Sequence, residues 1–215
     1  LPPLHPAQWG RSPARSHRVR GRYAGARRIN VPLSAVPEFG QQAFIATEDR
    51  RFYQHNGLDW RGFARALVTN LKAGRTREGF STITMQVARN TFAVRKYPAR
   101  SLRQKLTELR LSRLIERSLT KQQILELYFN VIYMGNGVYG VEAASRDLFG
   151  RSVNQVNMPQ AALLAALPKA PSAYTPRRHP DRAIARRNLV LSLMVQQGFI
   201  SANRLPGLQA EKLKI

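Results

Sequence analysis

The chain contains no cysteine among its 215 residues, so it can form neither disulfide bonds nor thiolate metal sites. It also lacks any run of about twenty apolar residues, the length that a membrane-spanning helix requires. Acidic residues are scarce, because only 12 Asp and Glu stand against 35 Lys and Arg, and the net charge is +23. Such a charge predicts attraction to an anionic partner: nucleic acid, a phospholipid surface or a phosphate-bearing substrate.

The hydrophobic content of 43% argues against disorder, and 215 residues fit one domain, or one domain with a small lobe. Residues 1–36 carry seven arginines and no acid, with too few apolar side chains to fold alone. We expect them to form an extended basic arm, ordered only where Val31–Leu33 lies along the folded domain at 37–215. Because the chain begins with Leu1 rather than methionine, we also expect that an amino-terminal anchor or signal has been removed.

Helical patterns with start and stop signals follow one another from Pro37 onward, whereas strand patterns are scarce. The sequence therefore predicts a mainly α fold. Helices are expected at about 37–48, 60–73, 81–90, 99–119, 141–149, 157–167 and 180–194, with another that Thr120 caps. Tyr133–Gly140 should form a glycine-punctuated turn, and Pro171–Pro176 an extended connection.

Apolar side chains recur at helical spacing in two of the expected helices. In the helix at 60–73 the apolar stripe consists of Phe63, Leu67 and Leu71. In the long helix at 99–119 the core stripe consists of Leu102, Leu106 and Leu109, and another face carries Lys105, Glu108 and Ser112.

The polar, glycine-bounded stretch Gly74–Phe80 predicts a mobile loop, which we expect to act as a gate over a cleft. Ser81 is predicted to cap the helix that follows. On one face of that helix, polar residues recur at helical spacing: Thr82, Gln86 and Arg89.

Two adjacent carboxylates, Glu48 and Asp49, lie where an apolar helical run meets an Asn-Gly turn. A carboxylate with apolar neighbours and cationic surroundings is suited to accept a proton close to a bound polyanion. Alternatively, both acids simply form ion pairs with neighbouring arginines such as Arg50 or Arg51.

Five stretches occur in order along the chain: EDRRFYQHNGLD, STITMQVARN, RSLRQKLTE, KQQILELYFNVIYMGNGVYGVEAA and ALLAALPKAPSAYTP. Together they resemble the peptidoglycan glycosyltransferases of glycosyltransferase family 51, over about Val31 to Glu211. Members of that family polymerise lipid II as monofunctional transglycosylases or as the amino-terminal domain of class A penicillin-binding proteins. The resemblance implies a lysozyme-like helical domain with a small mobile jaw lobe at about 60–100.

The resemblance also implies roles for individual residues. Glu48 matches the catalytic base, and Glu108 matches a second essential glutamate that orients cations or binds a divalent metal, Mg²⁺ or Mn²⁺, on the diphosphate. The positions that match substrate-binding residues are Asp49, His55, Ser81, Thr82, Gln86, Arg89, Asn90, Arg100 and Lys105. No organic cofactor is implied. Two alternatives stay open: Glu108 forms an ordinary i,i+3 pair with Lys105 on a solvated face, and His55 has a structural role beside the turn.

Three positions depart from the family pattern. Phe80 replaces the second glycine of a Gly-Gly pair, Met85 replaces a usual glutamine, and Gln104 replaces a usual arginine. We expect these departures to affect the reaction rate and the geometry of the bound substrate more than the identity of the reaction. The loss of an arginine at 104 weakens the predicted phosphate site, next to which Arg103 remains.

The implied reaction is an inverting transfer from a lipid diphosphate to the 4-hydroxyl of an acceptor sugar. It needs a base for the hydroxyl proton, Glu48, and cations for the departing diphosphate: Arg89, Arg100 and Lys105. A diphosphate leaves without being protonated, so one carboxylate suffices where a glycosidase needs two.

The implied partners are lipid II, the growing glycan strand, an anionic membrane surface, a moenomycin-type inhibitor and other cell-wall synthesis proteins. The implied location is the outer, periplasmic face of the inner membrane.

Two other functions are considered. A lytic transglycosylase or muramidase would cleave glycan and needs no phosphate-binding cations. A basic nucleic-acid-binding module would match the charge, but the chain has no recognised nucleic-acid motif.

Overall fold

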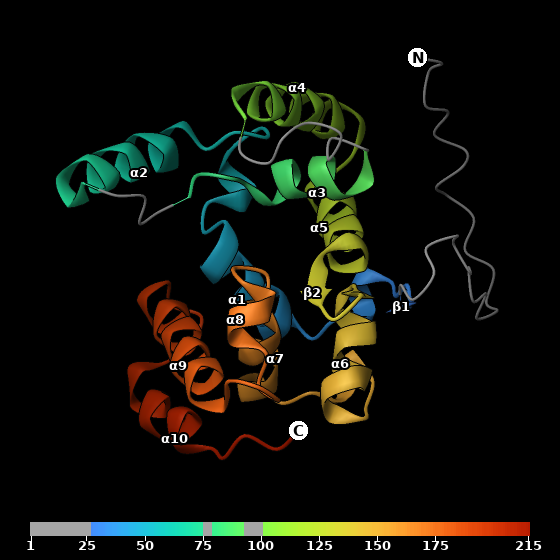
Figure 1. Ribbon diagram of the computed structural model, residues 1–215, viewed down its shortest axis with the longest axis vertical. Coiled ribbons are helices and arrows are strands. Elements are labelled where there is room, and N and C mark those ends of the chain that lie inside the picture. Colours follow the sequence, from blue (N-terminus) through green and yellow to red (C-terminus); the bar gives the residue numbers. More distant parts are fainter. Residues whose placement is uncertain (1–26, 75–78, 93–100) are drawn as a thin grey trace.

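Figure 1 shows the computed structural model of the chain, which describes residues 27–74, 79–92 and 101–215. At the centre of one helical group lies α7 (Met158–Ala166), which is apolar on every side and almost wholly buried. Asn157 caps it, since its side chain accepts a hydrogen bond from the Gln160 backbone nitrogen. Helices α1 (Glu38–Glu48) and α9 (Pro180–Gln196) pack against α7 and against each other.

A second helical group contains α3 (Ile83–Thr91), α4 (Leu102–Ser118) and α5 (Lys121–Val131). Helix α3 packs on both α4 and α5. The apolar side chains of both groups form one continuous core. The carboxyl end of α1 is therefore close to α3, and this junction positions the candidate site.

A small three-stranded sheet has the order β1 (Arg27–Arg28), β3 (Val138–Tyr139), β2 (Tyr133–Gly135). Strand β1 runs parallel to β3, and β2 runs antiparallel to it. Asn136 and Gly137 join β2 to β3 with φ angles of +50° and +71°, as a type I′ hairpin turn requires. The segment after β1 lies along α5, where Val31 and the Asn130 side chain exchange two 2.9 Å hydrogen bonds, as predicted for Val31–Leu33.

The remaining elements within the described ranges are α2 (Trp60–Ala73), α6 (Val141–Phe149), α8 (Pro171–Tyr174), α10 (Leu205–Ala210) and the short 3₁₀ turns Leu33–Ala35, Phe52–Gln54, Val153–Gln155 and Ala202–Arg204. Helix α2 projects from the rest of the protein (Figure 1) and ends at Gly74 in the left-handed conformation, as predicted.

Parts of the predicted gate and jaw lobe, 75–78 and 93–100, lie outside the described residues. The division into arm, domain and lobe stays a prediction.

The predicted core stripe of α4 is wrong at two of its three leucines, and two of the three residues in the apolar stripe of α2 are exposed as well. Leu67 and Leu71 of α2 are 49% and 73% exposed, because α2 projects away from the core. In α4, Leu102 and Leu106 are also exposed, whereas the buried residues are Gln104, Glu108, Ser112 and Ile115. Helix α4 thus turns its polar face inward, because that face packs on α3 and finds polar partners there.

Two local predictions are also wrong. The cap of α3 is Thr82, whose hydroxyl accepts a hydrogen bond from the Met85 backbone nitrogen, while the Ser81 hydroxyl is engaged by Lys105 instead. Part of the expected extended connection at 171–176 is the single helical turn α8, because Pro171 occupies the first helical position, where its missing N–H is not needed.

Candidate active site

Glu48 is the last residue of α1, after the buried apolar run Ala43–Ala46. Its Oε2 accepts a 2.8 Å hydrogen bond from the side-chain amide of Gln86 on α3. The side chain is half-buried, and burial raises the pKa of Glu48 above its ordinary value, while the Gln86 hydrogen bond opposes this rise. Three positive charges oppose it as well: Arg186, Lys169 and Arg89.

The alternative in which the two acids pair with neighbouring arginines is not what the structure shows. Arg51 pairs with Asp59 at 3.6 Å, and Glu48 is bound by Gln86. Asp49 has a different partner, His55, whose Nε2 lies 2.9 Å from both carboxylate oxygens.

The Asp49–His55 pair is almost wholly buried and ties the loop after α1 to the start of α3. The Ile83 backbone nitrogen donates to Asp49 Oδ2 at 3.0 Å, and the Thr82 hydroxyl donates to the Gly57 carbonyl at 2.7 Å. These bonds fix the amino-terminal end of α3 against the end of α1. They thereby hold Gln86, one turn further along α3, against Glu48.

We predict that Asp49→Ala destabilises the protein, because the buried His55 side chain and the Ile83 N–H both lose their acceptor. The expected loss is about 1–3 kcal/mol for each donor left unpaired, measured by chemical denaturation. The matched control is Asp181→Ala at an exposed position of α9, which should change the unfolding free energy by less than about 0.5 kcal/mol. Equal stability of the two variants would contradict this role for Asp49.

A second polar cluster lies between α3 and α4, around the fully buried Glu108. Lys105 Nζ donates to Glu108 Oε2 at 2.9 Å and to the Ser81 hydroxyl at 2.6 Å. Gln104 Nε2 donates to Glu108 Oε1 at 3.0 Å, and Arg89 Nη1 lies 3.7 Å from the same oxygen. The i,i+3 pair of Glu108 with Lys105 is therefore present, but on a buried face and not on a solvated one.

Helix α3 connects the two clusters. Gln86 and Arg89 are three residues apart and so lie on one face of the helix. Gln86 binds Glu48, and Arg89 reaches Glu108 while its charge also acts on Glu48. The structure thus places a carboxylate of raised pKa beside a set of cations, an arrangement that can remove a proton next to a bound anion.

For two of the predicted site residues, the structure gives little information about their role. Arg100 lies outside the described residues. Asn90 lies at the end of α3 and is half-buried. Of the departures from the family pattern, Met85 is buried in the core, and Gln104 directs its amide at Glu108.

Three residues near Glu48 were not predicted from the sequence to belong to the site, and Tyr128 among them was interpreted as a packing residue. Lys169 and Arg186 act on its charge, and the Arg186 guanidinium lies over the Tyr174 ring, 5.7 Å from its centroid. Tyr128 is fully buried, and its hydroxyl has no hydrogen-bond partner within the described part of the chain. Burial raises the pKa of Tyr128, and the charge of Glu48 raises it further. Of these three residues, only Lys169 lies in a stretch that carries the family resemblance, ALLAALPKAPSAYTP, so only Lys169 could have been suspected from the sequence.

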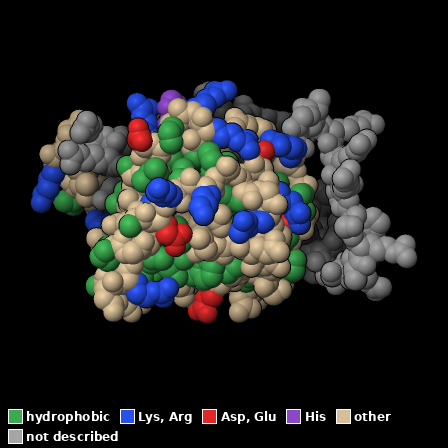
Figure 2. Space-filling model, turned by 90° about the horizontal axis from the view of Figure 1, so that it is seen from below, with side chains coloured by type: hydrophobic (Ala, Val, Ile, Leu, Met, Phe, Trp, Pro, Cys, Tyr) green, Lys and Arg blue, Asp and Glu red, His purple; other side chains and the backbone are tan. Residues whose placement is uncertain are grey.

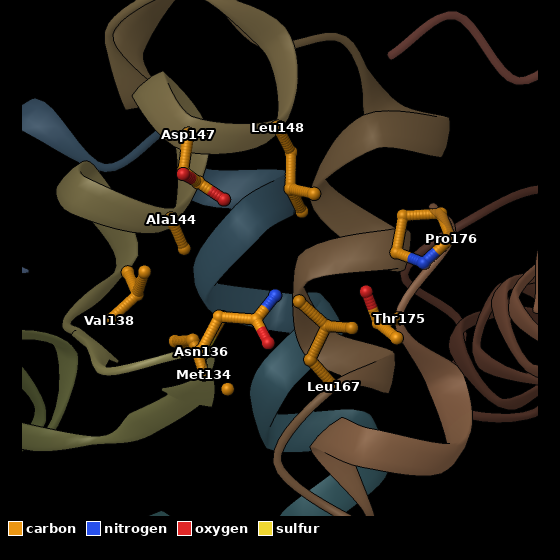
Figure 3. Close-up of a pocket in the computed structure, with 10 residues that line it drawn as sticks. Met134, Asn136, Val138, Ala144, Asp147, Leu148, Leu167, Thr175 and Pro176 are labelled. Atoms are coloured by element: carbon orange, nitrogen blue, oxygen red, sulfur yellow. The ribbon is translucent and has the colours of Figure 1, made fainter. Parts of the chain in front are cut away.

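A pocket lies between the β2–β3 hairpin, α6 and the segment after α8 (Figure 3). Its lining contains none of the predicted site residues. Asp147 at its edge pairs with Arg27 at 2.7 Å and with Arg177 at 3.1 Å. These ion pairs join β1 and the segment before α9 to α6, so this region is best described as a structural junction.

The chain is similar to known proteins in both sequence and structure. A model of the transglycosylase family matches residues 16–195. Penicillin-binding protein 1A of Aquifex aeolicus is 47% identical over 184 residues, which are 86% of this chain and 25% of that protein. The Escherichia coli penicillin-binding protein 1A is 46% identical over 191 residues, which are 89% of this chain and 22% of that protein. The chain thus spans about a quarter of these two relatives.

A protein of Cupriavidus necator named as a transglycosylase is 44% identical over 185 residues, which are 86% of this chain and 78% of that protein. The crystal structure of penicillin-binding protein 1A from Haemophilus influenzae superposes with a TM-score of 0.54 and 28% identity, covering 88% of this chain and 18% of that one. The predicted mainly α, lysozyme-like fold is confirmed. The chain belongs to the transglycosylase family, and its identification from sequence as a peptidoglycan glycosyltransferase domain is confirmed.

Proposed function

We propose that the chain polymerises lipid II by inverting transfer from a lipid diphosphate to the 4-hydroxyl of the acceptor sugar, with Glu48 as general base. One observation carries the proposal: α3 joins Glu48 to the cation cluster at Glu108 through Gln86 and Arg89. A base and a set of cations beside one face of α3 suit a reaction in which a proton leaves one oxygen while negative charge develops on another.

Glu48 removes the proton from the acceptor hydroxyl as that oxygen attacks the anomeric carbon of the donor sugar. The bond from this carbon to the diphosphate oxygen breaks at the same time, and the electron pair leaves with the diphosphate. A single displacement inverts the anomeric centre. The raised pKa of Glu48 makes it a stronger base than an ordinary glutamate and brings its pKa closer to neutral pH.

The departing diphosphate is stabilised by Lys105 and Arg89, joined by Arg100 outside the described residues. Ser81 and Glu108 hold the Lys105 ammonium from two sides, so its position is set before the substrate arrives. Thr82, Asp49 and His55 support this arrangement by fixing the start of α3. Asn90 completes the predicted substrate-binding set.

The residues around Glu108 do not fit a resident metal ion. Both of its carboxylate oxygens already accept hydrogen bonds from Lys105 and Gln104, and Arg89 lies beside them. Among the described residues, no group of three His, Asp or Glu side chains could hold a metal. We therefore assign Glu108 the role of orienting the cations and derive no step through a divalent ion.

We propose that the protein works at an anionic membrane surface, on the outer face of the inner membrane. No helix in the described ranges is long and apolar enough to cross a bilayer. Apolar side chains are exposed on α2 and at the start of α4: Trp60, Leu67, Val68, Leu71, Leu102 and Leu106. The sequence FAVRKY at 92–97 also predicts an apolar patch that enters the lipid, but only Phe92 lies within the described residues, where it is half-buried and packs against the core. The opposite side of the molecule from α4, seen in Figure 2, carries scattered basic side chains and few acidic ones.

Vesicle flotation tests the membrane proposal. We expect stronger binding to vesicles that contain anionic lipid than to neutral ones, because each basic residue near the surface contributes about 1 kcal/mol. Leu71→Glu on α2 should weaken binding, whereas Leu189→Glu on α9, also at an exposed leucine, should not. Equal binding to neutral and anionic vesicles would contradict the electrostatic part.

Turnover of purified lipid II, with and without moenomycin, tests the proposed function. We expect glycan strands to form and moenomycin to suppress them. Shortening of preformed glycan strands would instead indicate a lytic enzyme, and salt-dependent binding of a random oligonucleotide without lipid II turnover would indicate a nucleic-acid-binding module. Other cell-wall synthesis proteins remain proposed partners.

A further inference from the structure

An aromatic row leads from the exposed start of α2 to the cation cluster. The rings of Trp60 and Phe63 meet edge to face, with centroids 6.2 Å apart and an interplanar angle of 90°. Phe63 meets Phe80 in the same way at 5.0 Å and 86°. Phe80 is half-buried and immediately precedes Ser81, at the position where the family resemblance leads one to expect glycine.

The last member of the row touches the cation cluster directly. Lys105 Nζ lies over the Phe80 ring, 5.1 Å from its centroid. The same nitrogen donates to the Ser81 hydroxyl and to Glu108. The ammonium group is therefore held on three sides by a hydroxyl, a carboxylate and an aromatic face.

We propose that Phe80 is a positioning residue that holds the Lys105 ammonium in place for the leaving diphosphate. This inference rests on the proposed function of Lys105. A lysine is a point charge on a flexible four-carbon stem, so holding it in place costs side-chain entropy. An aromatic face restricts the stem and stabilises the charge through its quadrupole, and it does so without using an N–H that a phosphate oxygen needs. A glycine at position 80 would supply none of this.

The kinetic test uses Phe80→Leu, which keeps an apolar side chain but removes the ring. We expect kcat/KM for lipid II to fall about three- to tenfold, the range that corresponds to the loss of a partly exposed cation–π contact. Phe80→Tyr keeps the ring and should stay within about twofold of the wild type. Phe63→Leu removes the neighbouring ring, which does not touch Lys105, and should also stay within about twofold. A loss in Phe63→Leu equal to that in Phe80→Leu would assign the effect to the packing of α2 and overturn the inference.

A double-mutant comparison separates this inference from the proposed function. In a Lys105→Ala background, Phe80→Leu should cause no further loss, because the group that Phe80 holds is gone. If Lys105→Ala lowers turnover but Phe80→Leu does not, the positioning role of Phe80 fails and the role of Lys105 stands. If Lys105→Ala leaves turnover unchanged, the proposed role of Lys105 fails and the inference fails with it.

Proton NMR of the wild type supplies a readout that depends neither on activity nor on the folding of a variant. In the wild type, the ε-methylene protons of Lys105 should be shifted upfield by the ring current of Phe80. Lys121 lies over the Phe52 ring at 4.5 Å and serves as an internal reference. Phe80→Leu should move the Lys105 signal downfield and leave the Lys121 signal unchanged. An unshifted Lys105 signal in the wild type would overturn the proposal.

Discussion

Replacing Glu48 with glutamine should lower lipid II turnover on the order of 10²-fold or more while the protein remains folded. Glutamine keeps the shape of the side chain and can still accept a hydrogen bond from Gln86, but it cannot take the proton of the acceptor hydroxyl. Polymerisation close to the wild-type rate by Glu48→Gln would exclude Glu48 as the base.

The stability of the same variant supplies a control for folding. Burial raises the pKa of Glu48, so the folded state binds the proton more tightly than the unfolded state. The wild type therefore loses stability as pH rises from the ordinary glutamate pKa through the raised one. Glu48→Gln removes this charge penalty and should melt at a higher temperature than the wild type at neutral pH. The difference should shrink below the ordinary pKa, where both states of the wild type are protonated.

Replacing Glu108 with glutamine should lower turnover by about 10²-fold, because Lys105 and Arg89 lose the charge that holds them together. The introduced amide would stay in a fully buried position, and the two cations would repel each other. Loss of a partner from a fully buried pair costs about 3–5 kcal/mol. We expect about 1–3 kcal/mol here, since the Lys105 and Arg89 side chains are 28% and 31% exposed and water can solvate them.

The matched control for Glu108 is Glu142→Gln. Glu142 is also buried and paired, with Arg146 at 2.6 Å and the Val153 backbone nitrogen at 2.8 Å, but it lies on α6 among different residues. Glu142→Gln should destabilise the protein to a similar degree without a comparable loss of turnover per folded molecule. Normal turnover by Glu108→Gln, or an equal loss in both variants, would contradict the orienting role of Glu108.

Helix positions could be predicted from sequence because their start and stop signals are local. Thr120 caps α5 and Asn157 caps α7 with complete capping boxes, and Gly74 ends α2 in the left-handed conformation. The buried face of α4 could not be predicted in this way. A buried Glu108 is favourable only because Lys105 and other donors meet it, and the donors from α3 become neighbours only when the chain folds.

In the candidate site, too, some residues could be identified from sequence motifs, whereas others could be identified only from the folded structure. Motif positions identified Glu48, Gln86 and Arg89, and the structure brings these residues together. Tyr128 and Arg186 lie on α5 and α9, far from Glu48 in sequence, and their apolar or arginine-rich surroundings give no sign that they interact electrostatically with Glu48. Proximity across helices is set by core packing, which one sequence does not display.

The most direct test of the central claim, that Glu48 accepts the proton, is the pH dependence of lipid II turnover by the wild type and Glu48→Gln. Because a base must be deprotonated, wild-type kcat/KM should fall as pH drops through a single pKa that lies above the ordinary glutamate value. Glu48→Gln should show low residual turnover without this acidic limb. If the limb persists in Glu48→Gln at the same pH, another group accepts the proton and the account is wrong.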